Sequence, residues 1–383
     1  MNNNNQHIPA GYKLSPLGPI PEDWEVKRLG EICTHFKSGI TITSKEISDD
    51  GLYPVYGGNG LRGYANTYTH NGNFILIGRQ GALCGNINYV EGKNYISEHA
   101  IAVQTDENIQ WLKYKLVSWN LNRFSESSAQ PGLSVEKLVR YKLSVPTRSE
   151  QNKIADILSL WDTAIAKQAQ LVEKLTLRKR GLMQQLLTGK KRLKGFSGEW
   201  KRIKAGEIFK SISVKGNGSE VLLSATQEHG VIPRDQLEGR VTMPTGDTNS
   251  FKLVEVGDFV ISLRSFQGGL EYSEHRGIVS PAYTVLKPIV EIDKSFYRYY
   301  FKSAEFIGHL AIAVIGIRDG KQISYEDFCF VKIPYPNIEE QKAISSVLLQ
   351  ADKEIELAKK RLLHLQKQKQ GLMQVLLSGK RRI

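Results

Sequence analysis

The chain has 383 residues, of which 40% are hydrophobic and 24% are charged, a composition typical of a globular protein with two to four domains. Its 52 Lys and Arg against 39 Asp and Glu give a net charge of +13, which favours a polyanionic partner such as DNA. No apolar run approaches the ~20 residues of a membrane-spanning helix, and the polar start MNNNNQ is not that of a signal peptide.

The three cysteines, Cys33, Cys84 and Cys329, are scattered and form no CxxC pair. We expect free thiols in a reducing cytoplasm rather than disulfides or metal ligands. The eight histidines show no ligand spacing either, so no metal site is predicted.

The first half of the chain predicts an arm followed by a β-rich domain. Residues 1–20 are polar and contain Pro and Gly, and we expect a loose N-terminal arm. Residues 21–148 contain short apolar runs separated by turn residues, which is typical of a small, mostly β domain. One short helix is expected at Trp111–Leu116, and a strand ending at Pro146 closes the domain.

Residues 149–193 predict one long helix with a single apolar stripe. The apolar residues follow each other at alternating steps of four and three, which indicates a heptad seam. From Glu150 to Leu187 the helix would be about 57 Å long, at 1.5 Å per residue, and it ends at Gly189. A helix this long cannot bury its seam alone. The predicted seam residues are Ile154, Leu158, Trp161, Ile165, Val172 and Leu175 in this helix, and Ile344, Leu348, Ile355, Leu362 and Leu365 in a second one.

The second half of the chain repeats the first at a spacing of 190 residues. Residues 323–383 match residues 133–193 without a gap, with identities at 21 of 61 positions. Residues 194–336 therefore predict a second β-rich domain, and residues 337–383 a second long helix. We expect an α+β protein in which two mostly β domains are joined by two long antiparallel coiled-coil helices, with an internal pseudo-two-fold repeat. The helical pair would then set the distance between the two domains.

Catalytic motifs are not found in the sequence. Gly58–Gly63 fits the pattern GxGxxG, but the residues after it do not predict a helix, so a dinucleotide site is not expected. We find no phosphate-binding P-loop, no HExxH and no NPPY or DPPY segment of the kind that an adenine methyltransferase needs. The chain is predicted to be non-catalytic.

Two repeated motifs resemble those of the specificity (S) subunit of type I restriction-modification systems. They are P-x(3)-EQ-x(2)-I at the start of each long helix, from Pro146 and Pro336, and GLMQ-x-LL-[ST]-G-K at its end, from Gly181 and Gly371. The resemblance covers almost the whole chain. It implies that each β domain is a target recognition domain that reads one half of a bipartite, interrupted DNA target. It further implies that the helical pair docks two modification (M) subunits, which carry S-adenosylmethionine and methylate adenine. Restriction (R) subunits would add ATP- and Mg-dependent translocation and cleavage, and this chain itself would bind no cofactor.

The residues that read DNA are predicted from side-chain chemistry and from turns beside β-type runs. Arg pairs with guanine and Asn or Gln with adenine, while Lys contacts phosphates. The candidates are Lys37, Tyr56, Asn59, Arg62, Tyr64, Arg79 and Gln80 in the first half, and Lys210, Lys215, Arg264, Gln267, Arg318, Lys321 and Gln322 in the second. Each of them is alternatively an ordinary solvated surface residue.

Two other functions remain open at this point. The chain is alternatively a self-sufficient DNA-modifying enzyme with an unrecognised site, or a coiled-coil dimerisation protein whose basic charge is incidental. The first alternative predicts modification of DNA by the purified chain alone, and the second predicts DNA binding without sequence preference.

Overall fold

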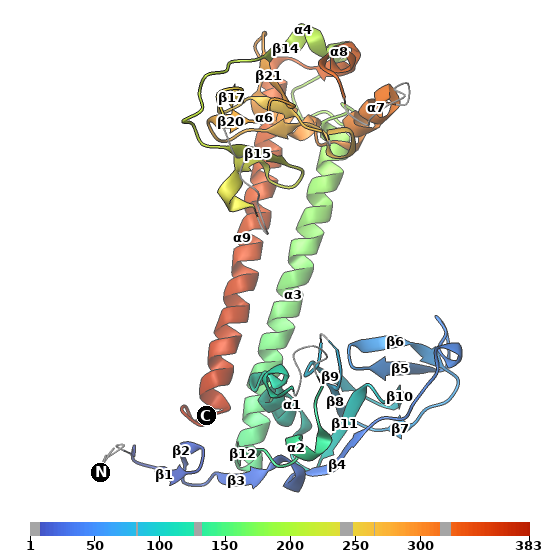
Figure 1. The fold of residues 1–383 in the computed structure, drawn as a ribbon, viewed down its shortest axis with the longest axis vertical. Helices are drawn as coiled ribbons and strands as arrows, with labels where there is room; N and C mark the ends of the chain where they lie inside the picture. The colour runs from blue at the N-terminus through green and yellow to red at the C-terminus, as the bar shows by residue number, and fades with distance from the viewer. Residues whose placement is uncertain (1–7, 82, 126–131, 238–247, 264, 315–322) are drawn as a thin grey trace. The chain divides into compact units, whose positions relative to one another are not determined.

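The computed structural model describes residues 8–81, 83–125, 132–237, 248–263, 265–314 and 323–383, and the chain divides into two compact units (Figure 1). The first unit contains Met1–Ala169 and Lys360–Ile383, and the second contains Gln170–Lys359. Each unit therefore combines one globular part with a portion of both long helices, α3 (Arg148–Leu186) and α9 (Ile338–Leu376).

The central sheet of the first unit has four antiparallel strands in the order β4-β11-β8-β9. Ile75 and Ile77 of strand β8 pack into the main core, whereas Phe74 and Leu76 pack into a second cluster on the other face, as the two-residue period of a strand requires. Both faces of this sheet are therefore covered. The strands are β4 (Cys33–Ser38), β8 (Phe74–Gly78), β9 (Ile87–Val90) and β11 (Ala100–Thr105).

A second sheet of the first unit has the order β6-β5-β10-β7. Its strands β5 and β6 form a hairpin that turns at Gly57–Gly60, while β10 pairs with β5 in parallel. The GxGxxG pattern thus lies in a hairpin with no helix after it, as expected. The strands are β5 (Tyr53–Gly57), β6 (Gly60–Ala65), β7 (His70–Asn71) and β10 (Lys93–Ile96).

The N-terminal arm is more ordered than the sequence predicts. Strands β1 (Tyr12–Ser15) and β2 (Gly18–Pro21) form an antiparallel hairpin, and the Tyr12 hydroxyl donates to the carbonyl oxygen of Gly379 at 2.7 Å. The prediction of a loose arm is therefore wrong for these residues, because a contact with the far end of the chain holds them. Strand β3 (Glu25–Arg28) then pairs with β12 (Lys142–Val145), so the two ends of the domain meet.

Helix α1 (Ile109–Ser118) contributes large side chains to the first core. It begins at Asn108, whose side chain accepts a hydrogen bond from Trp111 N. Trp111, Leu112 and Leu116 are buried in the main core. The short helix α2 (Val135–Leu138) precedes β12 and buries Leu138 in the same core.

The second unit repeats this plan. Its central sheet has the order β14-β21-β18-β19, which matches β4-β11-β8-β9 strand for strand. The remaining strands form three two-stranded ladders, β13 with β22, β15 with β16, and β17 with β20. The strands are β13 (Lys201–Lys204), β14 (Phe209–Ile212), β15 (Leu223–Thr226), β16 (Gly230–Pro233), β17 (Lys252–Val254), β18 (Phe259–Ile261), β19 (Glu271–Tyr272), β20 (Gly277–Val279), β21 (Thr284–Pro288) and β22 (Lys332–Tyr335).

The helices of the second unit surround a mainly aromatic core. Helix α6 occupies the place of α1 and begins at Asp293, whose side chain accepts from Phe296 N. Phe296 and Tyr297 are fully buried, together with Phe209, Phe301 and other rings. The helices are α4 (Ala205–Ile208), α5 (Ser265–Gly268), α6 (Lys294–Tyr300), α7 (Ala304–Val314) and α8 (Tyr325–Phe330).

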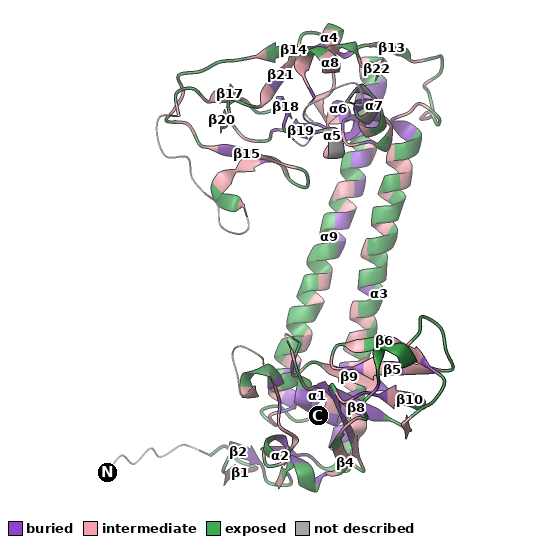
Figure 2. Ribbon diagram, turned by 45° about the vertical axis from the view of Figure 1, so that its right-hand side comes forward, coloured by how far each residue is buried: buried purple, intermediate pink, exposed green. Residues whose placement is uncertain are grey.

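The two long helices run antiparallel within each unit. In the first unit Asp162 of α3 contacts Lys369 of α9, and in the second Lys179 of α3 contacts Asp352 of α9. The seam residues are most buried where a globular part packs against the helices. Figure 2 shows such buried residues at the start of α9, beside the globular part of the second unit. Ile154, Leu158, Ile344 and Leu348 are buried, as is Ile355, whereas Trp161, Ile165, Val172, Leu175, Leu362 and Leu365 are half-buried.

Candidate nucleic-acid interface

The β5–β6 hairpin of the first unit holds four of the predicted DNA-reading residues. Asn59 is exposed at its turn, Arg62 is exposed on β6, and Tyr56 and Tyr64 are half-buried. Gly60 adopts a φ of +97°, which favours glycine at this position of the turn. The Arg62 side chain lies across the hairpin, because a Cβ on Gly57 would come within 2.6 Å of its Cδ.

The turn after β8 brings Arg79 and Gln80 to this hairpin. A Cβ on Gly78 would lie 2.5 Å from the carbonyl oxygen of Gly58, and one on Gly58 would lie 2.7 Å from that of His99. Arg79 N donates to His99 O at 2.9 Å. Three backbone segments thus meet where only glycine fits, and the two predicted clusters of the first half form one surface.

Several buried polar atoms beneath this surface have no hydrogen-bond partner among the residues that the structure describes. They are Ser97 Oγ, Asn88 Nδ2 and Glu98 Oε2. Ser97 Oγ would be 3.5 Å from a Cβ on Gly57, and Asn88 Oδ1 would be 3.9 Å from one on Gly60, so both lie at the hairpin. Sequence reasoning missed these residues, because nothing in a single sequence marks a serine or asparagine whose partner is absent.

The other predicted residue of the first unit, Lys37, is exposed on β4, where it pairs in register with Ala102 of β11. Burial lowers the pKa of the neighbouring His35, and Lys37 adds to this effect. Because Lys37 is exposed, it stays a predicted phosphate contact.

In the second unit the described residues place only some of the candidates. Lys210 is exposed on β14, at the strand that corresponds to β4, and Lys215 is exposed after it. Gln267 belongs to α5, but its side chain lies outside the described residues. Arg264, Arg318, Lys321 and Gln322 also lie outside them.

A second hairpin occupies the place of β5–β6 in this unit and was not predicted as a site. Strands β15 and β16 turn at Gln227–His229, and the turn borders a hollow of about 650 Å³ that Ser262, Leu263 and Tyr283 also line. Lys302 Nζ connects the hairpin turn to α5 and β19, since it donates to Gln227 O, Gly268 O and the Glu271 carboxylate. Burial raises the pKa of Glu271, and Lys302 partly offsets that effect. The only advance signal for this hairpin was the turn residue Gly230.

The two surfaces differ in chemistry. The first presents Arg62 and Arg79, for which the described residues provide no ion-pair partner, whereas the second presents Gln227, Glu228 and His229 at the same hairpin turn. Side chains that differ in this way recognise different base edges.

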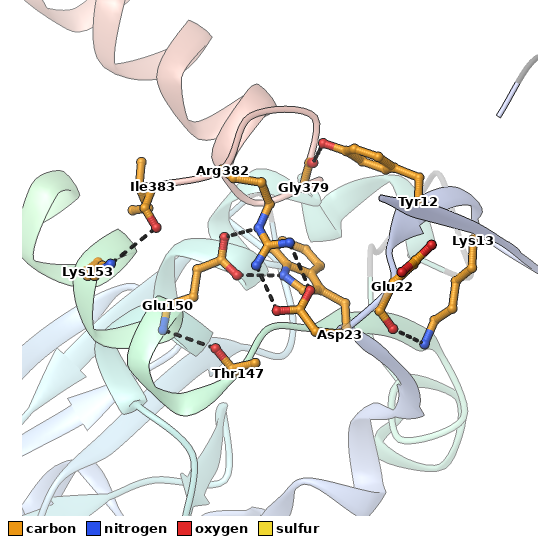
Figure 3. A network of polar contacts seen from close by, with 11 residues as sticks. Tyr12, Lys13, Glu22, Asp23, Thr147, Glu150, Lys153, Gly379, Arg382 and Ile383 are labelled. Carbon is orange, nitrogen blue, oxygen red and sulfur yellow. Dashed lines mark hydrogen bonds and ion pairs between the residues drawn. The ribbon is translucent and has the colours of Figure 1, made fainter. Parts of the chain in front are cut away.

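Each globular part is attached to the long helices by a similar clamp around a buried glutamate. In the first unit the Glu150 carboxylate accepts from Trp24 Nε1 and from Arg382 Nε, both at 2.8 Å, and Asp23 binds the other two guanidinium nitrogens (Figure 3). In the second unit Glu340 accepts from Trp200 Nε1 at 2.9 Å and from Arg192 Nε and Nη2 at 2.5 and 2.6 Å. The hydrogen bond from Arg382 lowers the pKa of Asp23.

The glutamine of each EQ pair attaches the short helix to the long one. Gln151 Nε2 donates to Pro146 O at 3.0 Å, and its Oε1 accepts from Asn108 N at 2.9 Å. Gln341 makes the same bonds to Pro336 O and Asp293 N, both at 2.8 Å. Since Asn108 and Asp293 are the residues before α1 and α6, these bonds explain why proline and EQ recur at a fixed spacing.

A Tyr–Asp–Lys triad links each domain to both helices. The Tyr114 hydroxyl donates to Asp162 Oδ2 at 2.6 Å, and Lys369 Nζ binds Oδ1 at 2.5 Å. Tyr299, Asp352 and Lys179 repeat this arrangement with the same distances. Burial alone would raise the pKa of Asp162, but the bonds from Lys369 and Tyr114 lower it overall. Lys179 and Lys369 occupy corresponding positions of the two repeats, and the triads explain why both positions carry lysine within the apolar seam.

The described residues contain no group of three or more His, Cys, Asp or Glu side chains that could hold a metal ion. In the same part of the chain no helix is both long and apolar enough to cross a membrane.

The chain is similar to known proteins of one family. The family described as type I restriction modification DNA specificity domain matches residues 21–177 and again 197–367. The Type I restriction enzyme EcoprrI specificity subunit of Escherichia coli is 44% identical over 143 residues, which are 36% of this chain and 35% of that relative. The chain thus spans about a third of that relative's length.

Other similarities cover nearly the whole chain. The Type I restriction enzyme MjaVIII specificity subunit of Methanocaldococcus jannaschii is 26% identical across 95% of this chain and 94% of its own length. The crystal structure of a type I restriction-modification S subunit from M. genitalium superposes with a TM-score of 0.59 at 16% identity, covering 98% of both chains. The fold is therefore that of two recognition domains with long connecting helices.

Proposed function

This chain belongs to the family of type I restriction-modification DNA specificity subunits, and we propose that it reads a bipartite, interrupted DNA target and brings methyltransferase subunits to it. The observation that supports the proposal best is the contrast inside the chain. The clamps that attach the two domains are the same, whereas the surfaces that the domains present at the hairpin differ. A scaffold used twice with unlike reading surfaces suits a target whose two halves differ in sequence.

The first unit is proposed to read its half-site through Arg62 and Arg79. Arginine binds guanine O6 and N7 bidentately in the major groove, and asparagine binds adenine in the same way. Asn59 and Asn88 lie at the same hairpin. We therefore expect at least one guanine in the half-site of the first unit, with Lys37 on a flanking phosphate.

Catalysis is proposed to come from partner subunits. Two M subunits would carry S-adenosylmethionine and methylate adenine, and R subunits would add ATP- and Mg-dependent cleavage in the cytoplasm. This chain would hold no cofactor of its own. The net charge of +13 supports a role on DNA, since Lys and Arg release counterions from its phosphates.

The proposal is tested by mapping methylated adenines in a genome that expresses this chain with its M subunit. We expect methylation at one interrupted sequence, and none from either protein alone. Exchanging residues 24–148 for the corresponding domain of another family member should change one half of that sequence and leave the other half intact. Methylation by the chain alone, or a change in both halves after the exchange, would contradict the proposal.

A further inference from the structure

The central sheets of the two units can be aligned residue by residue. The sequence Gly-Glu-Ile occurs at residues 30–32 and 206–208, directly before β4 and β14. The first residue of β4 pairs with Thr105 of β11, and the first residue of β14 pairs with Pro288 of β21. Thr105 and Pro288 therefore occupy equivalent places in the two sheets.

The alignment continues from these strands to β8 and β18. Two residues earlier in β11 and β21, Val103 pairs with Ile75 of β8, and Leu286 pairs with Phe259 of β18. Ile75 and Phe259 both pack into the main core of their unit. The next residue of each strand packs into a smaller cluster on the other face. Strand pairing and burial agree, so Ile75 corresponds to Phe259.

Leu263 therefore occupies the place of Arg79, because each lies four residues after one member of this aligned pair. Arg79 follows β8 directly, at the proposed reading surface of the first unit. Leu263 is 48% exposed, although leucine is among the residues most often buried. Where the first unit presents a guanidinium group, the second unit presents an apolar side chain.

The surroundings of Leu263 are apolar and acidic. Leu263 borders the hollow at the β15–β16 hairpin, which Ile232 and Leu237 also line. None of the described residues that line this hollow is lysine or arginine. Glu228 lies at the same hollow, and the ring of the neighbouring His229 is 4.0 Å from its carboxylate.

These side chains match a thymine–adenine pair better than a guanine–cytosine pair. In the major groove guanine presents two acceptors, O6 and N7, to which neither leucine nor a carboxylate can donate. Thymine presents its methyl group, which makes apolar contacts, and adenine presents an amino group, which can donate to a carboxylate. Cytosine also has an amino group, but it has no methyl group and its partner is guanine.

We propose that the second unit reads a thymine in its half-site and that Leu263 contacts the thymine methyl group. The inference rests on the proposed function, in which each unit reads one half of a bipartite target. Arginine in one unit and leucine at the equivalent place in the other allow one scaffold to recognise two unlike half-sites.

The test removes the methyl group from the DNA and the leucine from the protein. The half-site of the second unit is the half that stays unchanged when residues 24–148 are exchanged. Each thymine of that half-site is replaced in turn by deoxyuridine, which pairs with adenine but lacks the methyl group. Fluorescence anisotropy then gives the affinity of these duplexes for the complex of this chain with its M subunits.

The complex is prepared with the wild-type chain, with Leu263→Ala and with Val256→Ala as a matched control. Val256 is another exposed apolar residue of the second unit, but it precedes β18 (Phe259–Ile261), whereas Leu263 follows it. Both substitutions are at exposed positions, so the melting temperature should stay close to that of the wild type. The deoxyuridine duplexes test the wild type without any substitution.

We expect deoxyuridine at one thymine to weaken binding by the wild type and by the control about fourfold, as for the loss of one buried methyl group. The Leu263→Ala complex should bind the thymine and deoxyuridine duplexes equally, because the partner of the methyl group is gone. Its affinity for both should be at least about fourfold below that of the wild type for the thymine duplex.

Three results would overturn the thymine reader while the proposed function stands. They are a second half-site without a thymine–adenine pair, deoxyuridine duplexes that all bind the wild type as tightly as the thymine duplex, and a deoxyuridine effect that persists in Leu263→Ala. A wild-type complex that binds its mapped target no more tightly than unrelated DNA would instead overturn the proposed function itself.

Discussion

The two units solve the same structural problem with different ends of the chain. In the second unit the clamp arginine, Arg192, lies before Trp200 and Glu340 in the sequence. In the first unit the arginine is Arg382, 232 residues after Glu150, so the C-terminus must return to close the domain. The N-terminal hairpin and Asp23 hold it there. The comparison teaches that the clamp geometry is conserved within the chain even though the connectivity behind it is not.

The cores of the units differ more than their clamps. The second unit packs Phe209, Phe259, Phe301 and other rings against each other at centroid distances near 5 Å, including 5.2 Å between Phe259 and Phe301. The first unit uses aliphatic residues around Trp111. Core composition is therefore free to vary as long as volume is filled, whereas the Trp–Glu–Arg clamps and the Tyr–Asp–Lys triads recur in both units.

The largest test of the comparison removes the clamp carboxylate. Glu340 is buried, and Glu340→Ala would leave the half-buried Arg192 guanidinium with the carbonyl oxygens of Ser197 and Gly198 alone and would remove the acceptor of Trp200 Nε1. We expect a loss of roughly 3–5 kcal/mol in the free energy of unfolding. Glu150→Ala should cost less, because Arg382 keeps Asp23. Urea unfolding measures both, and equal losses would show that Asp23 does not compensate.

A second test uses a position at which the units differ in charge. Lys115 is 7% exposed and donates to Leu377 O at 2.6 Å, whereas the corresponding residue of the second unit is Tyr300. Burial lowers the pKa of Lys115 from 10.5 to about 8. The unfolded chain therefore holds this proton at pH values where the folded chain has released it, and stability rises with pH in that window.

The expected result is a pH-dependent difference between the wild type and Lys115→Met. From pH 8 to 10.5 the free energy of unfolding of the wild type should increase relative to the variant by up to about 3 kcal/mol. Below pH 8 both states are protonated and the difference should be constant. Denaturation of both proteins at several pH values checks this, and a difference that falls over the window would contradict the assigned charge state.

A third test sharpens the contrast between the reading surfaces. Arg62→Ala and Arg79→Ala should each weaken specific DNA binding by about 1–3 kcal/mol if the residue reads guanine, and relax one half-site only. Lys37→Ala should weaken binding to all sequences about equally and reduce its salt dependence. Methylome mapping and binding titrations at two salt concentrations separate the two behaviours. Relaxation of the other half-site would show that the units are not independent readers.

The smallest expected effect concerns the triads. Asp162→Asn would weaken the bonds from Lys369 and Tyr114, and Asp352→Asn those from Lys179 and Tyr299. The two aspartate side chains are 44% and 42% exposed, so we expect only about 1 kcal/mol for each. The losses should be similar in the two units and should shrink in 1 M salt. A much larger loss in one unit would show that the triads are not equivalent.

The sequence predicted the parts of the site that depend on local spacing. The strand before Arg79, the turn at Asn59 and the start of each long helix at EQ follow from short-range patterns. It could not predict that Gly58 and Gly78 pack against each other, or that Ser97 Oγ and Asn88 Nδ2 are buried nearby with no hydrogen-bond partner among the described residues. Those facts depend on which distant segments fold together. The hairpin turn Gln227–His229 was missed for the same reason, since only the strand order identifies it as the counterpart of the first.

By itself the sequence determined the duplication, the two long helices, the apolar seam and the family, because repeats and periods are properties of neighbouring residues along the chain. Only the tertiary structure decided what the repeated polar residues do. Glu150 meets Trp24 across 126 residues, and Lys369 meets Asp162 across 207. The first pair forms when the globular part packs on α3, and the second when α3 and α9 pack together, so no local pattern in the sequence predicts either.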